Sequence, residues 1–105
     1  MKFEVSNDFE KALKHLKKKY PSLVHDVLAF KEELTMNPLM GTELLPNCRK
    51  ARLAIKSKGK GKSGGGRIIF YFKVVEDSIL LLYLYDKAEM DSVSEAFIKE
   101  LLKTS

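Results

Sequence analysis

The segment from residue 49 to residue 73 reads RKARLAIKSKGKGKSGGGRIIFYFK. Near its start cations alternate with apolar residues, and near its end two cations flank an apolar run; both patterns are typical of β-strands. The middle is a run of lysine, serine and glycine. The spacing predicts strands over residues 49–56 and 67–75, joined by a flexible cationic loop. These strands fix the direction of many charged side chains, because residues two apart in a strand share one face.

The alternation sorts the side chains of both strands into two faces. On the first strand one face carries Lys50, Arg52, Ala54 and Lys56, and the other carries Ala51, Leu53 and Ile55. On the second strand the apolar row is Ile68, Phe70, Phe72 and Val74, and the opposite row is Arg67, Ile69, Tyr71 and Lys73. If both apolar rows face one core, Lys50, Arg52, Arg67 and Tyr71 converge on an open face. Such a face, without interleaved carboxylates, suits a phosphodiester backbone.

The rest of the chain predicts two more strands and three helices. Residues 2–6 alternate as a strand, and a capping box of Asn7 and Glu10 opens a helix over residues 7–19. A second helix begins at Leu23 and ends before residue 37, residues 37–48 form a loop, and residues 78–86 form a central strand. A last helix starts near Ser92. The order β-α-α-β-β-β-α predicts an α+β fold: a twisted antiparallel sheet with a helical hairpin on one face and a C-terminal helix.

Length and composition set the class of protein. The 105 residues predict one domain, residues 1–105, and the net charge of +5 favours an anionic partner. Cys48 is the only cysteine, which excludes an internal disulfide and agrees with a reducing compartment. The N-terminus carries charge where a signal peptide needs an apolar run, and residues 79–85 are too few to cross a bilayer. We therefore expect a cytoplasmic protein without membrane contact.

The glycine-rich loop allows a nucleotide-binding and an RNA-binding interpretation. Gly61-Lys62-Ser63 is similar to the end of a P-loop, but that motif needs glycine at position 56, which is lysine, and a helix after it, where a strand is predicted. This excludes a nucleoside triphosphate site. The residues predicted to contact an RNA backbone are Lys56, Lys58, Lys60 and Lys62 in the loop, and Tyr71 and Lys73 on the second strand. The alternatives are a solvated hairpin tip and an ordinary solvated sheet face.

A metal site is not expected. The two histidines, His15 and His25, fall in the predicted helices, away from the cationic face, and neither has a paired carboxylate nearby. Cys48 has no histidine close to it in sequence. We therefore expect neither a metal ion nor a cofactor.

Several short motifs occur in one order along nearly the whole chain. They are KKKYPSL at residues 17–23, Asn37-Pro38 with Gly41, RKARLA at residues 49–54, GKSGGGR at residues 61–67 and Tyr85-Asp86-Lys87. Together they resemble the RelE/ParE toxin superfamily of bacterial toxin–antitoxin modules, on its RelE/HigB side. The GKSGGGR segment followed by a strand is the most specific of them.

The resemblance implies a metal-independent endoribonuclease that cuts messenger RNA, commonly in the ribosomal A site, by attack of a 2′-hydroxyl on the adjacent phosphate. The catalytic positions of the family match Lys50, Arg52, Arg67 and Lys87. Arg67 would hold the scissile phosphate, and Lys87 would serve the leaving oxygen. Lys50 would be the base if the cations beside it keep it neutral by like-charge repulsion. RelE also uses a tyrosine near its final helix, and Val93 stands at that position here. Tyr71, Tyr83 or Tyr85 could take the place of that tyrosine from a different direction.

The implied partners are a cognate antitoxin protein, messenger RNA and the ribosome. Two other functions stay open: a ParE-like inhibitor of DNA gyrase, which shares the fold without nuclease chemistry, and an RNA-binding module with weak or no catalysis. The set Lys50, Arg52, Arg67 and Lys87 favours a nuclease over a gyrase inhibitor. Binding and cutting of RNA use the same cations, so the sequence does not separate the last two functions.

Overall fold

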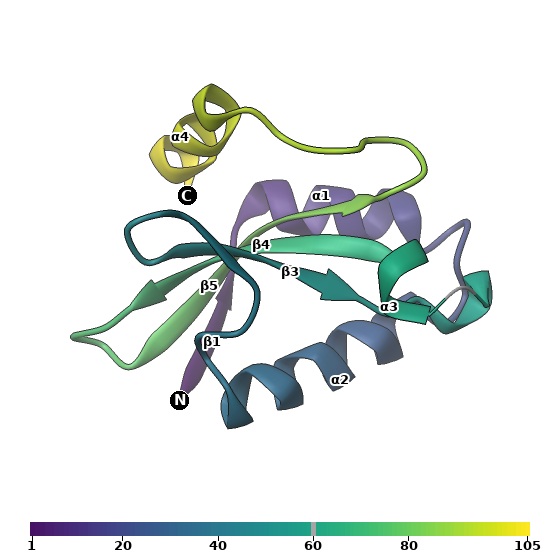
Figure 1. Ribbon diagram of the computed structural model, residues 1–105, viewed down its shortest axis with the longest axis horizontal. Coiled ribbons are helices and arrows are strands. Elements are labelled where there is room, and N and C mark those ends of the chain that lie inside the picture. The colour runs from purple at the N-terminus through teal and green to yellow at the C-terminus, as the bar shows by residue number, and fades with distance from the viewer. Residues whose placement is uncertain (60) are drawn as a thin grey trace.

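The computed structural model describes residues 1–59 and 61–105, with only the backbone described at residue 62. The strands are β1 Lys2–Val5, β2 Thr42–Leu45, β3 Cys48–Leu53, β4 Gly66–Lys73 and β5 Ser78–Asp86. The helices are α1 Asn7–Leu16, α2 Leu23–Met36, the 3₁₀ turn η1 Lys56–Lys58, the short α3 Gly61–Gly64, and α4 Glu95–Thr104. The α2 and α4 helices lie on opposite sides of the sheet (Figure 1). None of the helices in the described ranges has the length and apolar character to cross a membrane.

The five strands form one sheet in the order β1-β5-β4-β3-β2. Neighbouring strands are antiparallel except β1 and β5, which are parallel. The predicted α+β fold is confirmed, with two corrections to the sheet: it includes this parallel pair, and β2 lies inside the segment predicted to be a loop. The β2 strand has four residues at the sheet edge, too short a run to show periodicity in the sequence.

The helix starts differ from those predicted by one or two residues. Ser6, and not Asn7, is the N-cap of α1, since its Oγ accepts a hydrogen bond from the Phe9 amide at 3.0 Å. Ser6 Oγ also donates to the Leu82 carbonyl of β5 at 2.9 Å, which ties the helix start to the sheet. The last helix begins after Ser94, and not near Ser92, because Ser94 Oγ accepts from the Phe97 amide. The first helix ends at Leu16 rather than near residue 19.

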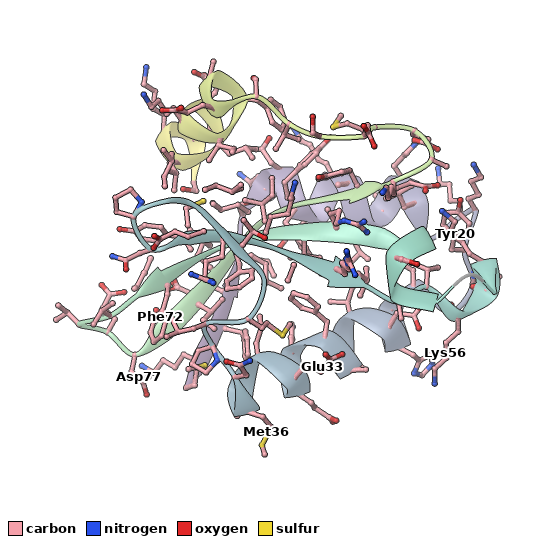
Figure 2. The ribbon with its side chains drawn as sticks, viewed as in Figure 1. Tyr20, Glu33, Met36, Lys56, Phe72 and Asp77 are labelled. Atoms are coloured by element: carbon pink, nitrogen blue, oxygen red, sulfur yellow. The ribbon has the colours of Figure 1, made fainter. Side chains whose placement is uncertain are left out.

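One face of the sheet packs against the helical hairpin of α1 and α2. The predicted apolar row is confirmed here for Ile68, Phe70 and Phe72, which join the core with residues of both helices. Val74 was predicted for the same row, but it lies beyond the end of β4 and is 62% exposed. Figure 2 shows the helix side chains filling the space against the sheet, while Met36 at the end of α2 points away from it.

The opposite face of the sheet is covered in part by α4. Ile69 and Tyr71 of β4, predicted to lie on an open face, belong to a second apolar cluster with Ile98 and Leu101 of α4. A bulge in the β4–β5 pairing follows Ile69, so the consecutive residues Leu82 and Tyr83 of β5 both belong to this cluster. The prediction of an open face is therefore wrong over this part of the sheet. The part of this face near Arg67 borders a cleft.

Candidate functional site

A cleft of about 550 Å³ lies at the end of the sheet where β4 begins and β5 ends. We call it the basic cleft. All four residues predicted to be catalytic line it: Lys50 and Arg52 of β3, Arg67 of β4, and Lys87 directly after β5. Its other lining residues are Met40, Gly41, Thr42, Ala51 and Asp91. Four cations around one hollow give a strongly positive potential that would draw a phosphate group into it.

The sheet register brings the cations together. Arg52 lies directly opposite Arg67 across the β3–β4 pairing, and Lys50 is two residues away on the same strand, opposite Ile69. Side chains at such positions project from the same face of the sheet. Lys87 joins them because its amide donates a hydrogen bond to the Gly65 carbonyl at 3.2 Å, which holds the end of β5 against the start of β4.

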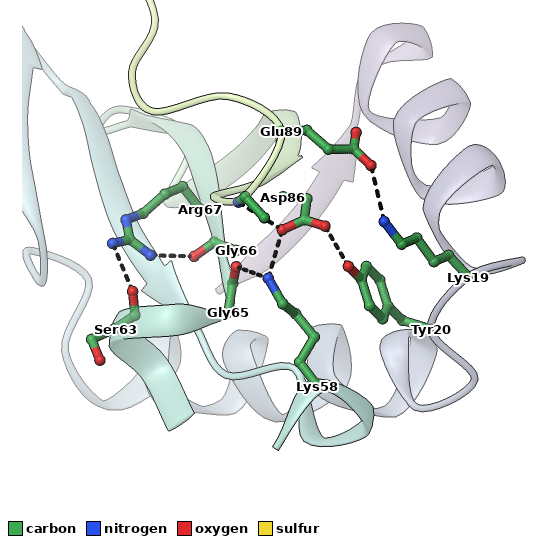
Figure 3. A network of polar contacts seen from close by, with 10 residues as sticks. Lys19, Tyr20, Lys58, Ser63, Gly65, Gly66, Arg67, Asp86 and Glu89 are labelled. Carbon is green, nitrogen blue, oxygen red and sulfur yellow. Dashed lines mark hydrogen bonds and ion pairs between the residues drawn. The ribbon is translucent and has the colours of Figure 1, made fainter. Parts of the chain in front are cut away.

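Arg67 lies at the floor of the basic cleft and is only 8% exposed. Its guanidinium donates hydrogen bonds to the Gly66 carbonyl at 2.8 Å and to the Ser63 carbonyl of α3 at 3.3 Å (Figure 3). The segment predicted to be a flexible loop thus contains a short helix that supports the arginine. A buried guanidinium held in one orientation is a pre-organised phosphate ligand, because it loses little freedom on binding.

Asp86 anchors the wall of the cleft next to Lys87. Its carboxylate is fully buried and accepts hydrogen bonds from the Lys58 ammonium at 2.6 Å, from the Ala88 amide at 2.9 Å and from the Tyr20 hydroxyl. The Lys58 ammonium also donates to the Gly65 carbonyl at 3.2 Å. This network joins the helical hairpin, η1 and the end of β5 at one point (Figure 3).

The network changes the acidity of its members. Burial alone would raise the pKa of Asp86, but the hydrogen bonds from Lys58, Tyr20 and the Ala88 amide outweigh burial and hold that pKa below its ordinary 3.8. The hydrogen bond to Asp86, with burial, raises the pKa of the Tyr20 phenol. Asp86 is therefore ionised at neutral pH, and Lys58 is its charged partner.

The opposite wall is the segment that leads into β2. Arg49 Nε donates to the Met40 carbonyl at 3.1 Å, and its guanidinium donates to the Gly41 carbonyl at 2.9 Å. Gly41 has a φ of +85°, and a Cβ there would lie 2.2 Å from the Lys50 carbonyl oxygen. Only glycine fits this close approach, which brings the wall against the strand that carries Lys50 and Arg52.

Among the residues predicted to contact RNA, the four whose side chains the structure describes do not line the basic cleft. Lys56 is exposed in η1, and the side chain of Lys58 is 8% exposed in the Asp86 network. Tyr71 and Lys73 line a separate hollow of about 590 Å³ near β1 and the end of α4, where Lys73 forms an ion pair with Glu4 at 3.0 Å. Lys60 and the side chain of Lys62 lie outside the described residues.

Two residues near the cations, Asp86 and Asp91, were not singled out in sequence for this site, and Tyr85 was named only as one of three tyrosines that could replace the missing one. Asp86 anchors the network, Asp91 lines the basic cleft, and Tyr85 lies directly opposite Arg67 across the β4–β5 pairing. The motif Tyr85-Asp86-Lys87 was the available signal, but sequence alone does not say which of its members is buried. Val93 packs in the second apolar cluster.

The described residues contain no group of three or more histidine, cysteine or acidic side chains that could hold a metal ion. The chemistry that the cleft itself offers is electrostatic: an arginine fork at the floor, ammonium groups on the walls and one carboxylate. Such a set can bind a phosphodiester and stabilise added negative charge on it.

No protein-family model matches this chain. Solved structures with a similar fold include the isolated RelE toxin of E. coli, with a TM-score of 0.58 and 15% sequence identity, covering 97% of this chain and 96% of that one. A RelE mutant in the free state, with two arginines replaced by alanine, gives a TM-score of 0.60 and 12% identity over 97% of this chain and 94% of that one. At this identity the comparison shows that the chain has the RelE fold.

Proposed function

We propose that this protein is the toxin of a type II toxin–antitoxin module and that it inhibits translation by cleaving messenger RNA on the ribosome. The observation that carries the proposal is the convergence of Lys50, Arg52, Arg67 and Lys87 on one cleft in a chain with the RelE fold. These four residues are also the positions at which the sequence resembles the family's catalytic set.

The proposed reaction is an internal transesterification of the RNA chain. The 2′-hydroxyl oxygen attacks the adjacent phosphorus, the bond from phosphorus to the 5′-oxygen breaks, and the products carry a 2′,3′-cyclic phosphate and a 5′-hydroxyl. A base takes the proton of the 2′-hydroxyl, and an acid supplies a proton to the leaving 5′-oxygen. No external oxidant, reductant or metal enters this balance.

The cations of the basic cleft divide these roles. Arg67 holds the scissile phosphate through its planar fork and stabilises the charge that develops on the equatorial oxygens. Arg52, directly opposite, adds a second fixed charge. Lys87 donates to the leaving 5′-oxygen. Lys50 is the group placed to accept the proton of the 2′-hydroxyl.

The proposed partner in the cell is an antitoxin protein that neutralises the toxin. A cleft with four cations suits an antitoxin segment rich in acidic residues, which would occupy the place of the RNA phosphates. Binding of that segment and cleavage of RNA would then exclude each other.

The test is induced expression in bacteria followed by mapping of messenger RNA 5′ ends. The wild-type protein should produce new 5′ ends within coding regions and arrest growth, and Arg67→Ala should remove both effects. Lys14→Ala is the matched control, since Lys14 is an exposed cation on α1. Growth arrest without new 5′ ends, accompanied by inhibition of purified gyrase, would replace the nuclease proposal with the ParE-like function. RNA binding without new 5′ ends would replace the nuclease proposal with the RNA-binding module.

A further inference from the structure

The hydroxyl group of Tyr85 is buried without a hydrogen-bond partner. Tyr85 is 4% exposed, and its hydroxyl and Ser78 Oγ are the two such side-chain atoms among the described residues. Buried polar atoms in proteins nearly always have a partner, so an unpartnered hydroxyl calls for an explanation. Phenylalanine would fill the same space without that cost. Within the folded chain the hydroxyl therefore carries a desolvation cost without making a hydrogen bond.

Tyr85 lines a smaller hollow of about 200 Å³, beside Asp86 and Met90, and not the basic cleft itself, but it is the direct neighbour of a cleft residue. Tyr85 lies directly opposite Arg67 in the β4–β5 register, and both residues are buried on the face of the sheet that carries the cleft. Two cleft residues influence its ionisation: burial raises the pKa of the phenol above its ordinary 10, Arg67 opposes this rise, and Asp91 adds to it. Tyr85 is thus protonated at neutral pH and can act as a donor.

We propose that the Tyr85 hydroxyl is a substrate-contacting donor of the basic cleft, which hydrogen-bonds an oxygen of the phosphate group held by Arg67. The inference rests on the proposed function for the identity of the substrate, an RNA phosphodiester. The hydroxyl is covered in the structure. Asp91 is the carboxylate that lines the cleft, and the entering phosphate, also an anion, takes its place beside Arg67 and Tyr85.

The role proposed for Tyr85 is distinct from that of its neighbour Tyr83. The two rings are stacked with centroids 6.3 Å apart, and Tyr83 also packs edge-on against Phe97 of α4 at 5.1 Å. Tyr83 pairs with Ile69, which lies two residues along β4 from Arg67, and Tyr83 is not fully buried. Removal of its hydroxyl is the same chemical change at a site where we expect no contact with phosphate.

The experiment compares Tyr85→Phe with Tyr83→Phe in three measurements on the full chain. The first is cleavage of ribosome-bound messenger RNA, the second is the affinity for a 2′-O-methyl RNA oligonucleotide that cannot be cleaved, and the third is the melting temperature. Tyr85→Phe should lower the cleavage rate about tenfold to a hundredfold and weaken oligonucleotide binding about tenfold, as expected for a lost hydrogen bond to a charged group. Its melting temperature should stay the same or increase. Tyr83→Phe should leave cleavage and binding unchanged.

The outcomes separate this inference from the proposed function. If the wild-type protein does not cleave RNA but Tyr85→Phe alone weakens oligonucleotide binding, the nuclease proposal fails and the phosphate contact stands. If the wild type cleaves and Tyr85→Phe cleaves and binds equally well, the function stands and the contact is refuted. A fall in melting temperature with Tyr85→Phe would show an internal partner for the hydroxyl and would also overturn the inference.

Discussion

Replacement of Lys58 by methionine tests whether the Asp86 network holds the basic cleft together. Methionine keeps much of the length and apolar stem of lysine but removes the ammonium that lies 2.6 Å from the Asp86 carboxylate. The Asp86 side chain has no exposed surface, and that of Lys58 is 8% exposed, so the variant leaves a buried charge without its countercharge. Removing one member of a buried ion pair costs about 3–5 kcal/mol. We take about 3 kcal/mol, at the low end, because Asp86 keeps its bonds from Tyr20 and the Ala88 amide.

This free energy corresponds to a large shift in melting temperature. An unfolding entropy of about 2.1 cal/mol/K per residue gives about 0.2 kcal/mol/K for the 105 residues. A loss of about 3 kcal/mol therefore lowers the melting temperature by about 14 °C. Lys56→Met is the matched control, because Lys56 is an exposed lysine in the same η1 turn. We expect it to change the melting temperature by only about 2 °C, as is usual for an exposed site. Thermal unfolding followed by circular dichroism measures both variants.

The pH dependence gives this prediction a second test. The hydrogen bonds that depress the pKa of Asp86 stabilise the wild type above pH 3.8, and this contribution is lost as the pH falls through the folded-state value. In Lys58→Met the hydrogen bond from lysine no longer opposes the effect of burial on the pKa of Asp86. The Asp86 carboxylate therefore takes up its proton at a higher pH than in the wild type. The difference in melting temperature should therefore be largest near pH 7 and become smaller below about pH 4. Equal melting temperatures for Lys58→Met and Lys56→Met at pH 7 would refute the structural role of the pair, as would a difference that does not vary with pH.

Three further results are expected. Gly65→Ala should lower the free energy of unfolding by about 3 kcal/mol, the upper end for overpacking, because a Cβ there would lie 2.1 Å from the Leu53 carbonyl oxygen. Equal midpoints of urea unfolding for Gly65→Ala and Gly59→Ala would contradict this prediction. Gly59→Ala should lower the free energy of unfolding by only about 1 kcal/mol. Its φ of +70° is unfavourable for alanine, but no atom lies within 4 Å of the added carbon. Burial raises the pKa of the Cys48 thiol to about 11, so iodoacetamide should modify it about a hundredfold more slowly than a thiol of pKa 9. Fast alkylation of the native protein, detected by mass spectrometry, would show that the thiol is accessible.

The strand alternation was enough to predict which face three of the cleft cations share. Lys50, Arg52 and Arg67 lie on regular parts of β3 and β4, where a period of two decides the direction of a side chain. The same rule failed further along the sheet. The bulge after Ile69 changes the alternation in β5, and no glycine or proline in that run signals it. A sequence also does not tell which face a terminal helix will cover, and α4 covers the face that was expected to be open.

The role of Lys58 could not be predicted because a lysine among glycines is usually solvated. Its burial depends on Asp86, which is 28 residues away in sequence, and on Tyr20 in the helical hairpin. Such a contact follows from the folded arrangement of three elements and not from any local pattern. The same holds for the Tyr85 hydroxyl, whose burial without a partner appears only when the sheet and α4 are in place.

The cleavage rate of messenger RNA by purified protein in a reconstituted translation reaction tests the role of the basic cleft most directly. Wild type, Arg67→Ala and Lys14→Ala are compared after circular dichroism has shown that each is folded. We predict fragments with 5′-hydroxyl ends from wild type and Lys14→Ala at similar rates, and a loss of about a hundredfold or more with Arg67→Ala. Undiminished cleavage by folded Arg67→Ala, or an equal loss with Lys14→Ala, would contradict the assignment of catalysis to this cleft.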